Sequence, residues 1–549
     1  MKRIRNSILC LLFLLLSITL VACSNTQTVS TIPQTTLSPE LSGGERSYNI
    51  DLNIKDDNYR NYYEIFVWSF CDTDSNGIGD FNGVTSKLDY IKDLGFNGIW
   101  LMPINKGTSY HKYDVEDYYS VDPQFGTMTD FTNLLTEAHK RGIRVIIDLV
   151  VNHTSINCSW FREAVQYIKD NGMPGGTYGD YYNFTNQSKG STYYQITGTQ
   201  YYYECPFWSG MPDLNLDSVN VKNEITNIVN YWLEIGVDGF RLDATTSYYS
   251  SNMEKNIEFL SWLNGVVKAK SPNAYMVGEA WYSSHSLIRS YYNSGVDSFF
   301  NFPLMGGEGG IAKALNDNRD DNGVAFSTLL TTLDSTYDVG ILAPFLSNHD
   351  TNRITNFAGK SKPEKIKMVN GLLSLLKGSP FVYYGEEIGM TVTNTSSDPY
   401  RRVAILWNSS KTGGYCTKAP DGAVATTQAY PFPSVEDQMN DPNSILNYYK
   451  YCNYLRNTNP EIARGTTTIK DYSKQSKYVS VFTRTYEGKT ITIVANLNNS
   501  LSININLDKN DLGYSGLSQY LCTNSNYRVL YDSLSQSVTM PPYSIAIFR

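Results

Sequence analysis

The stretch that decides the fold is GVDGFRLDA, residues 236–244. Successive side chains of a β-strand face opposite sides, so Arg241 and Asp243 share one face. Phe240 and Leu242 share the other. An arginine two residues before an aspartate keeps that carboxylate ionised and fixes its direction, which suits a nucleophile. The alternative is an ordinary salt bridge at a strand end, because structural ion pairs are common. Segments elsewhere in the chain decide between the two.

Short apolar runs rich in β-formers alternate with helix-period stretches from about residue 62 onward. Eight such runs, each followed by a helix or a loop, predict an α/β fold, a parallel (β/α)8 TIM barrel. Catalytic residues are then expected at the carboxyl ends of the strands. The predicted strands are Glu64–Phe70, Gly98–Met102, Arg144–Val150, Gly239–Asp243, Ala274–Gly278, Ser298–Phe302, Ile341–Leu346 and Pro380–Tyr384. The predicted helices are Val84–Leu94, Asp130–Arg141, Val219–Ile235, Met253–Lys268 and Lys365–Leu376.

One interval between predicted elements is too long for a loop. Residues 153–217, rich in Tyr, Gly, Asn and Ser, follow the third strand, and we expect an inserted subdomain B lying over the barrel mouth. The barrel then comprises residues 48–152 and 218–460. From residue 461 to 549 the pattern changes to alternating strands, which predicts a C-terminal antiparallel β-sandwich domain.

The N-terminus carries a targeting signal. Three basic residues among the first five precede an apolar run over residues 8–21 that is too short to span a bilayer comfortably. This run ends in LVAC, which resembles a bacterial lipobox. The resemblance implies a signal peptide at 1–22 and lipid attachment at Cys23. Residues 23–47 are rich in Ser, Thr, Pro and Gln and predict a flexible tether. We therefore expect an extracellular lipoprotein on the cell surface, touching the membrane only through this anchor.

Length, net charge and aromatic content restrict the class of protein. A chain of 549 residues should hold two or three domains. Its net charge of −8 and its scattered basic residues argue against a nucleic-acid partner. Its 43 tyrosines suit stacking on sugars, although half-buried tyrosines of an extracellular protein are the alternative. We expect a monomer.

Cysteine usage argues against a zinc site, because no C-x-x-C pair is present. In an oxidising compartment some cysteines are expected to pair, and Cys158 with Cys205 is the first candidate. The sequence leaves the connectivity open.

Four segments, each at or near the end of a predicted strand, carry a family resemblance: DLVVNH at 148–153, GFRLDA at 239–244, VGEAW at 277–281 and FLSNHD at 345–350. Together they resemble the signature segments of the α-amylase family of glycoside hydrolases. The resemblance runs from about residue 60 to the C-terminus. Supporting matches are MPDLN at 211–215 and GSP at 378–380, which leads to YGEEIGM at 384–390. The MPDLN segment resembles a group intermediate between oligo-1,6-glucosidases and neopullulanases.

The resemblance implies a catalytic role for three carboxyl groups. Asp243 is the nucleophile, Glu279 the general acid/base and Asp350 a third carboxylate that binds ring hydroxyls. Glycoside cleavage passes through an oxocarbenium-like cation, and retention of configuration requires the two reacting carboxyls to lie about 5–5.5 Å apart. Arg241 favours the charged form of Asp243. Glu279 must hold a proton near neutral pH, which a neighbouring carboxylate and an apolar wall such as Trp281 would arrange.

Five further residues are candidates for binding substrate. His153 and His349 match the imidazoles that hydrogen-bond the sugar at the cleavage site; satisfied buried histidines are the alternative. His111 and Tyr113 resemble the loop whose tyrosine stacks under that sugar, and a local core role is the alternative. Arg353 either pairs with a site carboxylate or caps a turn.

Two positions after the nucleophile bear on specificity. Many family members carry Lys-His where this chain has Thr246 and Ser247, so the grip on the leaving group is absent or supplied elsewhere. Ala244 resembles members that act on α-1,4 linkages, whereas members favouring α-1,6 tend to carry Val. The main hypothesis is retaining, endo-acting hydrolysis of α-1,4-glucosidic bonds in starch and related α-glucans. Alternatives are a neopullulanase/cyclomaltodextrinase-type or α-glucosidase activity on shorter glucans, and, in a different class, a non-catalytic starch-binding surface protein.

The segment DTDSNGIGD, residues 72–80, places oxygen ligands at alternating positions around a tight glycine turn. It resembles the start of an EF-hand loop, but the twelfth position is Gly83 where a bidentate Glu is needed. It matches better the calcium loop after the first strand in part of the α-amylase family. A capped turn without an ion is the alternative, and a second calcium held by Asn152 and subdomain B is a further hypothesis. The implied Ca²⁺ ligands are Asp72, Asp74, Asn76, Asp80 and the carbonyl of Ile78.

Overall fold

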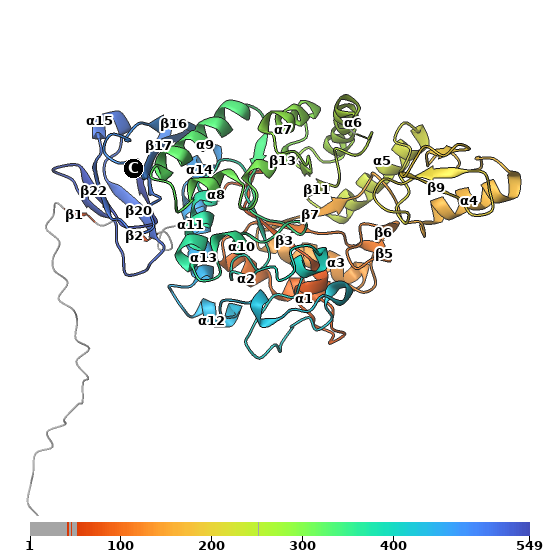
Figure 1. Ribbon diagram of the computed structural model, residues 1–549, viewed down its shortest axis with the longest axis horizontal. Coiled ribbons are helices and arrows are strands. Elements are labelled where there is room, and N and C mark those ends of the chain that lie inside the picture. Colours follow the sequence, from red (N-terminus) through yellow and green to blue (C-terminus); the bar gives the residue numbers. More distant parts are fainter. Residues whose placement is uncertain (1–40, 43–44, 47–51, 251) are drawn as a thin grey trace, which may run out of the picture. The chain divides into compact units, whose positions relative to one another are not determined.

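The computed structural model of the chain describes residues 41–42, 45–46, 52–250 and 252–549 (Figure 1). The predicted signal peptide 1–22, the lipidation residue Cys23 and most of the predicted tether lie outside these residues. Within the described ranges, no helix has both the length and the apolar character that crossing a bilayer requires.

Eight parallel strands form one sheet, in the order β14-β13-β12-β11-β7-β4-β3-β15. A parallel bridge between Phe345 and Phe381 joins the two ends of this order and closes the barrel. The predicted (β/α)8 barrel is therefore confirmed, with each strand shorter than the apolar run that predicts it. The first strand is also displaced: it begins at Tyr62, and Val67–Ser69 of the predicted strand forms a 3-10 helix. The strands are β3 (Tyr62–Ile65), β4 (Gly98–Leu101), β7 (Arg144–Leu149), β11 (Gly239–Leu242), β12 (Tyr275–Gly278), β13 (Ser298–Phe300), β14 (Ile341–Ala343) and β15 (Phe381–Tyr383).

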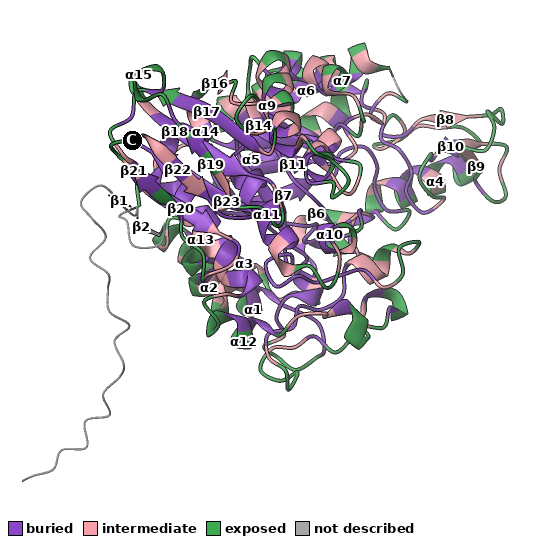
Figure 2. Cartoon of the chain, turned by 60° about the vertical axis from the view of Figure 1, so that its left-hand side comes forward, coloured by how far each residue is buried: buried purple, intermediate pink, exposed green. Residues whose placement is uncertain are grey.

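Helices cover the outside of the barrel, which is why its strands are buried on both faces (Figure 2). All five predicted helical stretches are helical, but Val84–Leu94 is two short helices that meet at Lys87. Gly239 allows β11 and β12 to approach closely, because a Cβ there would lie 1.9 Å from the Tyr275 carbonyl oxygen. The helices of the barrel are α1 (Phe81–Ser86), α2 (Leu88–Asp93), α3 (Met128–Lys140), α5 (Val219–Ile235), α6 (Met253–Lys270), α7 (His285–Tyr291), α8 (Gly310–Ala314), α9 (Asn322–Thr336), α10 (Ile354–Ala358), α11 (Pro363–Ser374), α12 (Val435–Met439), α13 (Ile445–Thr458) and α14 (Pro460–Arg464).

Two insertions rise from the carboxyl end of the barrel. After β4, the hairpin β5 (Asn105–Gly107) and β6 (Val115–Val121) carries the loop with His111 and Tyr113. After β7, the segment 153–217, which Figure 1 draws largely in yellow, folds as subdomain B. It contains helix α4 (Ser159–Asn171) and a three-stranded sheet of β8 (Phe184–Thr185), β10 (Tyr202–Glu204) and β9 (Tyr193–Gln195).

The expected disulfide between Cys158 and Cys205 is wrong, because both thiols are free. The Cys205 thiol donates to carbonyls of its own loop, including that of Met211 at 3.0 Å. The Cys158 thiol lies beside Thr154 and Tyr182. Burial raises the pKa of each thiol to about 11, which disfavours the reactive thiolate.

Two packed sheets make up the C-terminal domain, as the alternation predicts. Side chains of β17 alternate between two cores: Phe482 belongs to the core shared with the barrel, and Val481 to the core between the sheets. The first sheet has the order β16-β17-β18-β23-β20-β2 and the second β1-β21-β22-β19. Their strands are β16 (Thr466–Lys470), β17 (Val479–Tyr486), β18 (Lys489–Asn496), β19 (Ile503–Asn506), β20 (Leu517–Cys522), β21 (Leu530–Asp532), β22 (Ser537–Met540) and β23 (Ser544–Phe548), with helix α15 at Lys509–Leu512.

Two short strands join this domain from the N-terminal side. β1 (Leu41–Ser42) pairs antiparallel with β21, and β2 (Glu45–Arg46) pairs parallel with β20. Both fall within the segment 23–47 that the composition predicts as a tether. The end of that segment therefore pairs with the C-terminal domain.

Candidate active site

One arginine organises the centre of the site. Arg241 lies on β11 and is completely buried. Its Nη1 lies 2.5 Å from Asp148 Oδ1 and 2.5 Å from Asp243 Oδ1, and its Nη2 lies 3.0 Å from Glu279 Oε1. These carboxylates come from β7 and from the residues just after β11 and β12. A single guanidinium thus joins three neighbouring strand ends, which is where a barrel presents its catalytic groups.

Glu279 is held from two sides. The backbone N–H of Ala244 donates to Glu279 Oε2 at 2.9 Å, and Ala244 adopts a left-handed φ of +46° to do so. Strained backbone of this kind concentrates at functional sites. The Thr245 hydroxyl donates to the Glu279 carbonyl oxygen at 2.7 Å, which fixes the main chain on the other side.

Burial raises the pKa of Glu279 to about 7; Arg241 opposes this shift, and the carboxylates of Asp243 and Asp350 add to it. The shift suits a group that must hold a proton near neutral pH. The predicted apolar wall, Trp281, is 47% exposed and stacks on Phe302.

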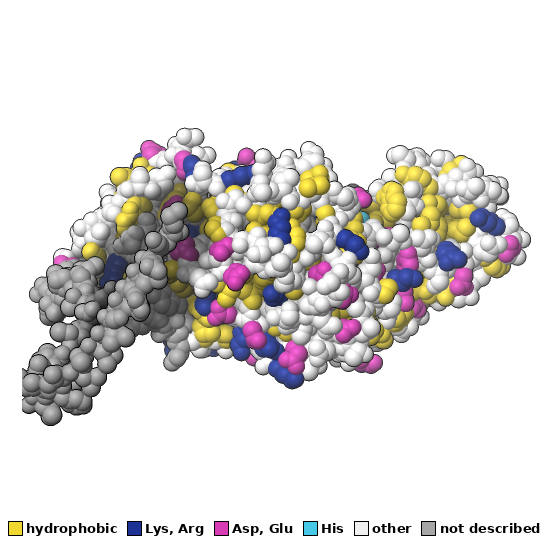
Figure 3. Space-filling view, turned by 90° about the horizontal axis from the view of Figure 1, so that it is seen from below, with side chains coloured by type: hydrophobic (Ala, Val, Ile, Leu, Met, Phe, Trp, Pro, Cys, Tyr) yellow, Lys and Arg dark blue, Asp and Glu magenta, His cyan; other side chains and the backbone are white. Residues whose placement is uncertain are grey.

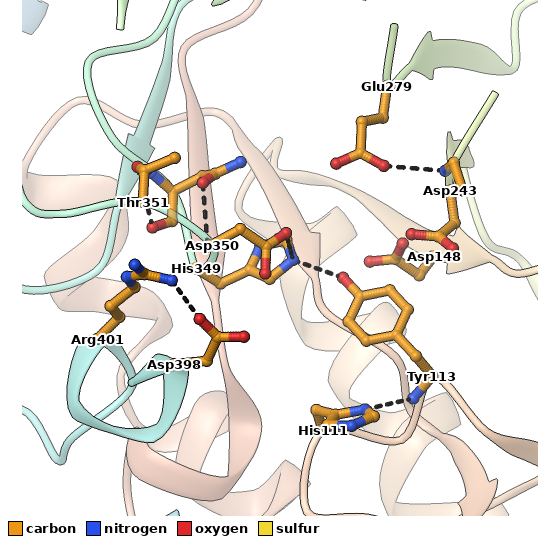
Figure 4. Close-up of polar contacts among 12 residues, drawn as sticks. His111, Tyr113, Asp148, Asp243, Glu279, His349, Asp350, Thr351, Asp398 and Arg401 are labelled. Atoms are coloured by element: carbon orange, nitrogen blue, oxygen red, sulfur yellow. Dashed lines mark hydrogen bonds and ion pairs between the residues drawn. The ribbon is translucent and has the colours of Figure 1, made fainter. Parts of the chain in front are cut away.

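Asp350 lies across from this pair, after β14 (Figure 4). Its Oδ2 lies 2.9 Å from His349 Nε2, and its Oδ1 lies 2.7 Å from Arg402 Nη2. Burial acts to raise the pKa of Asp350, but His349 and Arg402 outweigh it and hold the pKa well below its usual range. Asp350 is therefore a permanent negative charge in the site.

His349 is the cation that faces this charge. Its Nδ1 lies 2.6 Å from Glu64 Oε1, a buried carboxylate on β3. Burial acts to lower the pKa of His349, but Asp350 and Glu64 together raise it to about 9. The imidazole is thus protonated at neutral pH and holds Asp350 in place.

Tyr113 connects the two halves of the site. Its hydroxyl lies 2.8 Å from His349 Nε2 and accepts from Arg241 Nη1 at 3.4 Å, and its ring stacks on the His349 ring. Its backbone N–H donates to His111 Nδ1 at 3.2 Å. Burial lowers the pKa of His111 to about 3, so that ring is neutral. Asp243, Glu279 and Asp350 therefore surround one space, with Tyr113 at its side (Figure 4).

His153 connects the active site to subdomain B. It forms a β-bridge with Asp213 of that subdomain, and its Nε2 is buried without a hydrogen-bond partner among the described residues. Burial lowers the pKa of His153, so the ring is neutral. A buried polar atom without a partner is expected to meet one on a ligand. The half-exposed ring of Phe207 lies 5.4 Å from the His153 ring.

The structure gives Arg353 other partners. Its guanidinium is buried, donates to the carbonyls of Tyr384 and Arg401, and lies over the Tyr383 ring. No described carboxylate forms an ion pair with it. Arg402 pairs with Asp350 instead.

Sequence reasoning missed the site roles of four residues: Asp148, Arg402, Glu64 and Phe207. Asp148 opens the segment DLVVNH, so its position before a predicted strand end was a usable signal. Arg402 lies in the long irregular stretch after β15, where no local pattern singles it out.

The acidic loop after β3 is a candidate calcium site. Carboxylate oxygens of Asp72, Asp74 and Asp80 lie within 4.8 Å of one another, and none of the described cationic side chains forms an ion pair with them. The loop turns through Ser75, which has a φ of +64°. Asn76 lies inside the turn, with its amide donating to Asp74 at 2.9 Å. A donor set made only of oxygen suits Ca²⁺, so these residues fit the ion.

A second set of oxygens lies between the barrel and subdomain B. Asn152 Nδ2 donates to Asp213 Oδ1 at 3.0 Å, while Asn152 Oδ1 is buried without a partner in the described structure. Burial and the nearby Glu204 raise the pKa of Asp213 to about 8. These oxygens are the described basis for the hypothesis of a second calcium.

Paired carboxyl groups at the carboxyl end of a closed (β/α)8 barrel, one of them tuned to hold a proton, define a glycoside hydrolase site. Comparison of the sequence with known families supports the same class of protein. The family model described as Alpha amylase, catalytic domain, matches residues 64–465. The chain belongs to the α-amylase family.

Several characterised proteins are similar to it. Alpha-amylase 3 of Dictyoglomus thermophilum is 36% identical over 83% of this chain and 89% of its own. An oligo-1,6-glucosidase of Parageobacillus thermoglucosidasius is 30% identical over 79% of this chain and 89% of its own. Among solved structures, Eubacterium rectale Amy13B is 40% identical with a TM-score of 0.85, over 92% of this chain and 99% of that one.

Proposed function

We propose that this glycoside hydrolase cleaves internal α-1,4-glucosidic bonds of starch-like polymers with retention of configuration. The observation that carries the proposal is the single guanidinium of Arg241 shared by Asp243 and Glu279. It holds two carboxyl groups side by side, as a double-displacement mechanism needs. The separation of about 5–5.5 Å between the reacting carboxyls stays a prediction.

The reaction proceeds in two steps. Asp243 attacks the anomeric carbon while Glu279 gives its proton to the departing glycosidic oxygen, which leaves a covalent glycosyl-enzyme. Glu279, now a carboxylate, takes a proton from water, and that water releases the sugar from Asp243. Asp350 binds ring hydroxyls and favours the positive charge that develops on the ring. His153 donates or accepts at another hydroxyl through its free Nε2.

A second candidate is activity on shorter glucans or on α-1,6 linkages. It is favoured by Thr246 and Ser247, which stand where many family members grip the leaving group, and by the similarity to an oligo-1,6-glucosidase. Ala244 supports the α-1,4 proposal instead. Reducing-end assays on soluble starch, pullulan and maltose, run side by side, test this. Fast release from starch with little from maltose is expected; preferential cleavage of maltose or pullulan would contradict the endo-α-1,4 proposal.

A non-catalytic starch-binding protein on the same fold is the competitor from a different class. Loss of catalysis would be expected to show as loss of site carboxylates. Asp243, Glu279 and Asp350 are all present and surround one space, which argues against it. On the face in Figure 3, Lys and Arg are scattered among Asp and Glu, which argues against a nucleic-acid partner there.

We propose further that the mature protein is a monomer on the outside of the cell, held by a lipid on Cys23. An external enzyme suits polymers too large to import. Replacing Cys23 by Ala should move the activity from the membrane fraction to the medium. Equal membrane association of the two proteins would contradict the anchor.

Calcium is proposed at the acidic loop, held by Asp72, Asp74, Asn76, Asp80 and the Ile78 carbonyl, where it would rigidify the segment after β3.

A further inference from the structure

A groove of about 390 Å³ lies where the barrel meets the C-terminal domain, away from the catalytic carboxylates. Its volume is within the range of small-molecule sites. The residues that the argument uses come from both domains: Asp317, Lys362 and Lys365 from the barrel, and Asn499, Asn524 and Tyr527 from the C-terminal domain.

The barrel wall of this groove lies at the catalytic end of the barrel. Asp317 precedes the start of α9, and Lys362 precedes the start of α11. In a (β/α)8 barrel each helix begins on the side where the strands end, which is the side of the active site. A larger cavity of about 680 Å³ is lined by Gly340 and Leu342, at the start of β14, and so belongs to the opposite end.

The groove offers an aromatic face. The Tyr527 side chain is 42% exposed, and no other described ring or cation packs against it. The C–H face of a glucose ring is apolar and stacks on such a ring, while the hydroxyl groups at its edge stay hydrated. The larger cavity lacks this feature, because Arg464 lies 5.0 Å over the ring of Tyr59 and Tyr337 is buried.

Polar groups suited to sugar hydroxyls stand beside that ring. Lys362 Nζ lies 2.7 Å from Asp317 Oδ2, and these side chains are 56% and 33% exposed. Lys365 Nζ lies 3.1 Å from the other oxygen, Oδ1, which also accepts from Asn499 Nδ2 at 3.5 Å. A donor next to an acceptor matches two adjacent ring hydroxyls, each of which both donates and accepts. The Asn524 side chain also lines the groove; its Oδ1 accepts from the Asn526 N–H at 2.9 Å, and its Nδ2 adds a further donor.

We propose that this groove is a second α-glucan binding site, in which Tyr527 stacks on a glucose ring and the Asp317–Lys362 pair and Asn499 hydrogen-bond its hydroxyls. The proposal rests on the proposed function, because it takes the same polymer as ligand. A chain held here and in the active site at once binds more tightly than at either site alone, since the second contact becomes intramolecular.

The test compares affinity for soluble starch among inactive proteins that all carry Glu279→Gln, measured by retardation in starch-containing native gels. The active site is then the same in every sample, so differences report on the groove. Adding Tyr527→Ala should raise Kd about fivefold to tenfold, the loss expected for one stacking contact. Tyr194→Ala is the matched control, because Tyr194 is 40% exposed in subdomain B; its Kd should stay within twofold of the parent.

Asn499→Ala is the second variant, and it removes an exposed side chain without touching the aromatic ring. It should raise Kd about twofold to threefold, as expected for one hydrogen bond. Values within experimental error of the parent for both Tyr527→Ala and Asn499→Ala would overturn the site. The unsubstituted protein is assayed separately on soluble starch: absence of hydrolysis would refute the proposed function, whereas hydrolysis with unchanged binding would refute only the groove.

Discussion

Two clusters of three acidic side chains in this protein differ in what balances their charge. Asp148, Asp243 and Glu279 converge on the buried guanidinium of Arg241. The acidic loop, Asp72, Asp74 and Asp80, is partly exposed and faces backbone N–H groups of its own turn. Asp72, for example, accepts from the N–H groups of Ser75 and Gly77.

The difference teaches which acidic cluster does chemistry and which one fits an ion. A fixed cation inside the barrel lets several buried carboxylates coexist, and burial raises the pKa of two of them, Asp148 to about 6 and Glu279 further. Glu279 is the group whose pKa rises to about 7. Neutral hydrogen-bond donors of the turn, which include the Asn76 amide and the Thr73 hydroxyl, orient the carboxylates of the acidic loop without cancelling their charge. Net negative charge is therefore left for a divalent cation. The predictions below test this contrast, from the largest expected effect to the smallest.

Glu279→Gln should lower starch hydrolysis by about three to four orders of magnitude, because the amide cannot give up a proton to the leaving group. Reducing-end release from soluble starch measures it, with glucan binding retained. Glu386→Gln is the matched control, since Glu386 is also fully buried and burial raises its pKa well above the usual value. This control should not show the large loss of hydrolysis expected for Glu279→Gln. Retention of more than a tenth of the activity by Glu279→Gln would show that another group is the acid.

Arg241→Met should lower the free energy of unfolding by about 3–5 kcal/mol, because it leaves buried carboxylates without their cation. Denaturant unfolding followed by tryptophan fluorescence measures the change. Arg144→Met is the control: Arg144 also pairs with two carboxylates, Asp56 and Asp238, but its side chain is 43% exposed. That variant should lose less than about 1 kcal/mol. Equal losses would mean that Arg241 does not carry the buried network.

Removing calcium with a chelator should lower the melting temperature by several degrees. Calcium at a hundredfold excess over its Kd stabilises the folded state by about 2.7 kcal/mol, and the chelator removes this stabilisation. Asp74→Asn should abolish this sensitivity, because it removes one of the carboxylates proposed to hold the ion; Asp74 is exposed, so the change itself disturbs little packing. Asp217→Asn, at an exposed aspartate paired with Lys255, should preserve it. A melting temperature that the chelator does not change would argue for a capped turn without an ion.

The pH profile of kcat/KM should fall above about pH 7 by roughly tenfold per unit, because Glu279 then loses the proton it must donate. Removing a neighbouring negative charge makes ionisation of Glu279 easier and lowers its pKa. Asp350→Asn should therefore move the alkaline limb to lower pH in whatever activity remains. A shift to higher pH would contradict the assignment of this limb to Glu279.

The resemblance of local segments to the α-amylase family identified most of the catalytic groups, and each of these segments follows a recognisable apolar run. GFRLDA and VGEAW place Asp243 and Glu279 at strand ends, and parallel strands of one barrel end at the same face. Arg402 could not be found this way. It lies about fifty residues after Asp350 in an irregular stretch, and only the folded chain brings its guanidinium within 2.7 Å of that carboxylate.

Cysteine pairing and the role of Arg353 show the same limit. Cys158 and Cys205 belong to one subdomain, yet each thiol is held by its own neighbourhood. Arg353 follows Asp350 closely in sequence, but its side chain turns inward to the Tyr384 carbonyl. Proximity along the chain constrains where a backbone passes and leaves the direction of a long side chain to packing.

By itself the sequence predicted a barrel of eight parallel strands, because strand periodicity is a local property. The resemblance of its strand-end segments to the α-amylase family pointed to the three carboxyl groups. Tertiary structure alone decided which cation balances each carboxylate, how far burial raises the pKa of Glu279 and where the exposed ring of Tyr527 lies beside polar groups of the barrel. Those properties depend on distances between segments far apart in the chain, and electrostatic energies change steeply with such distances and with burial.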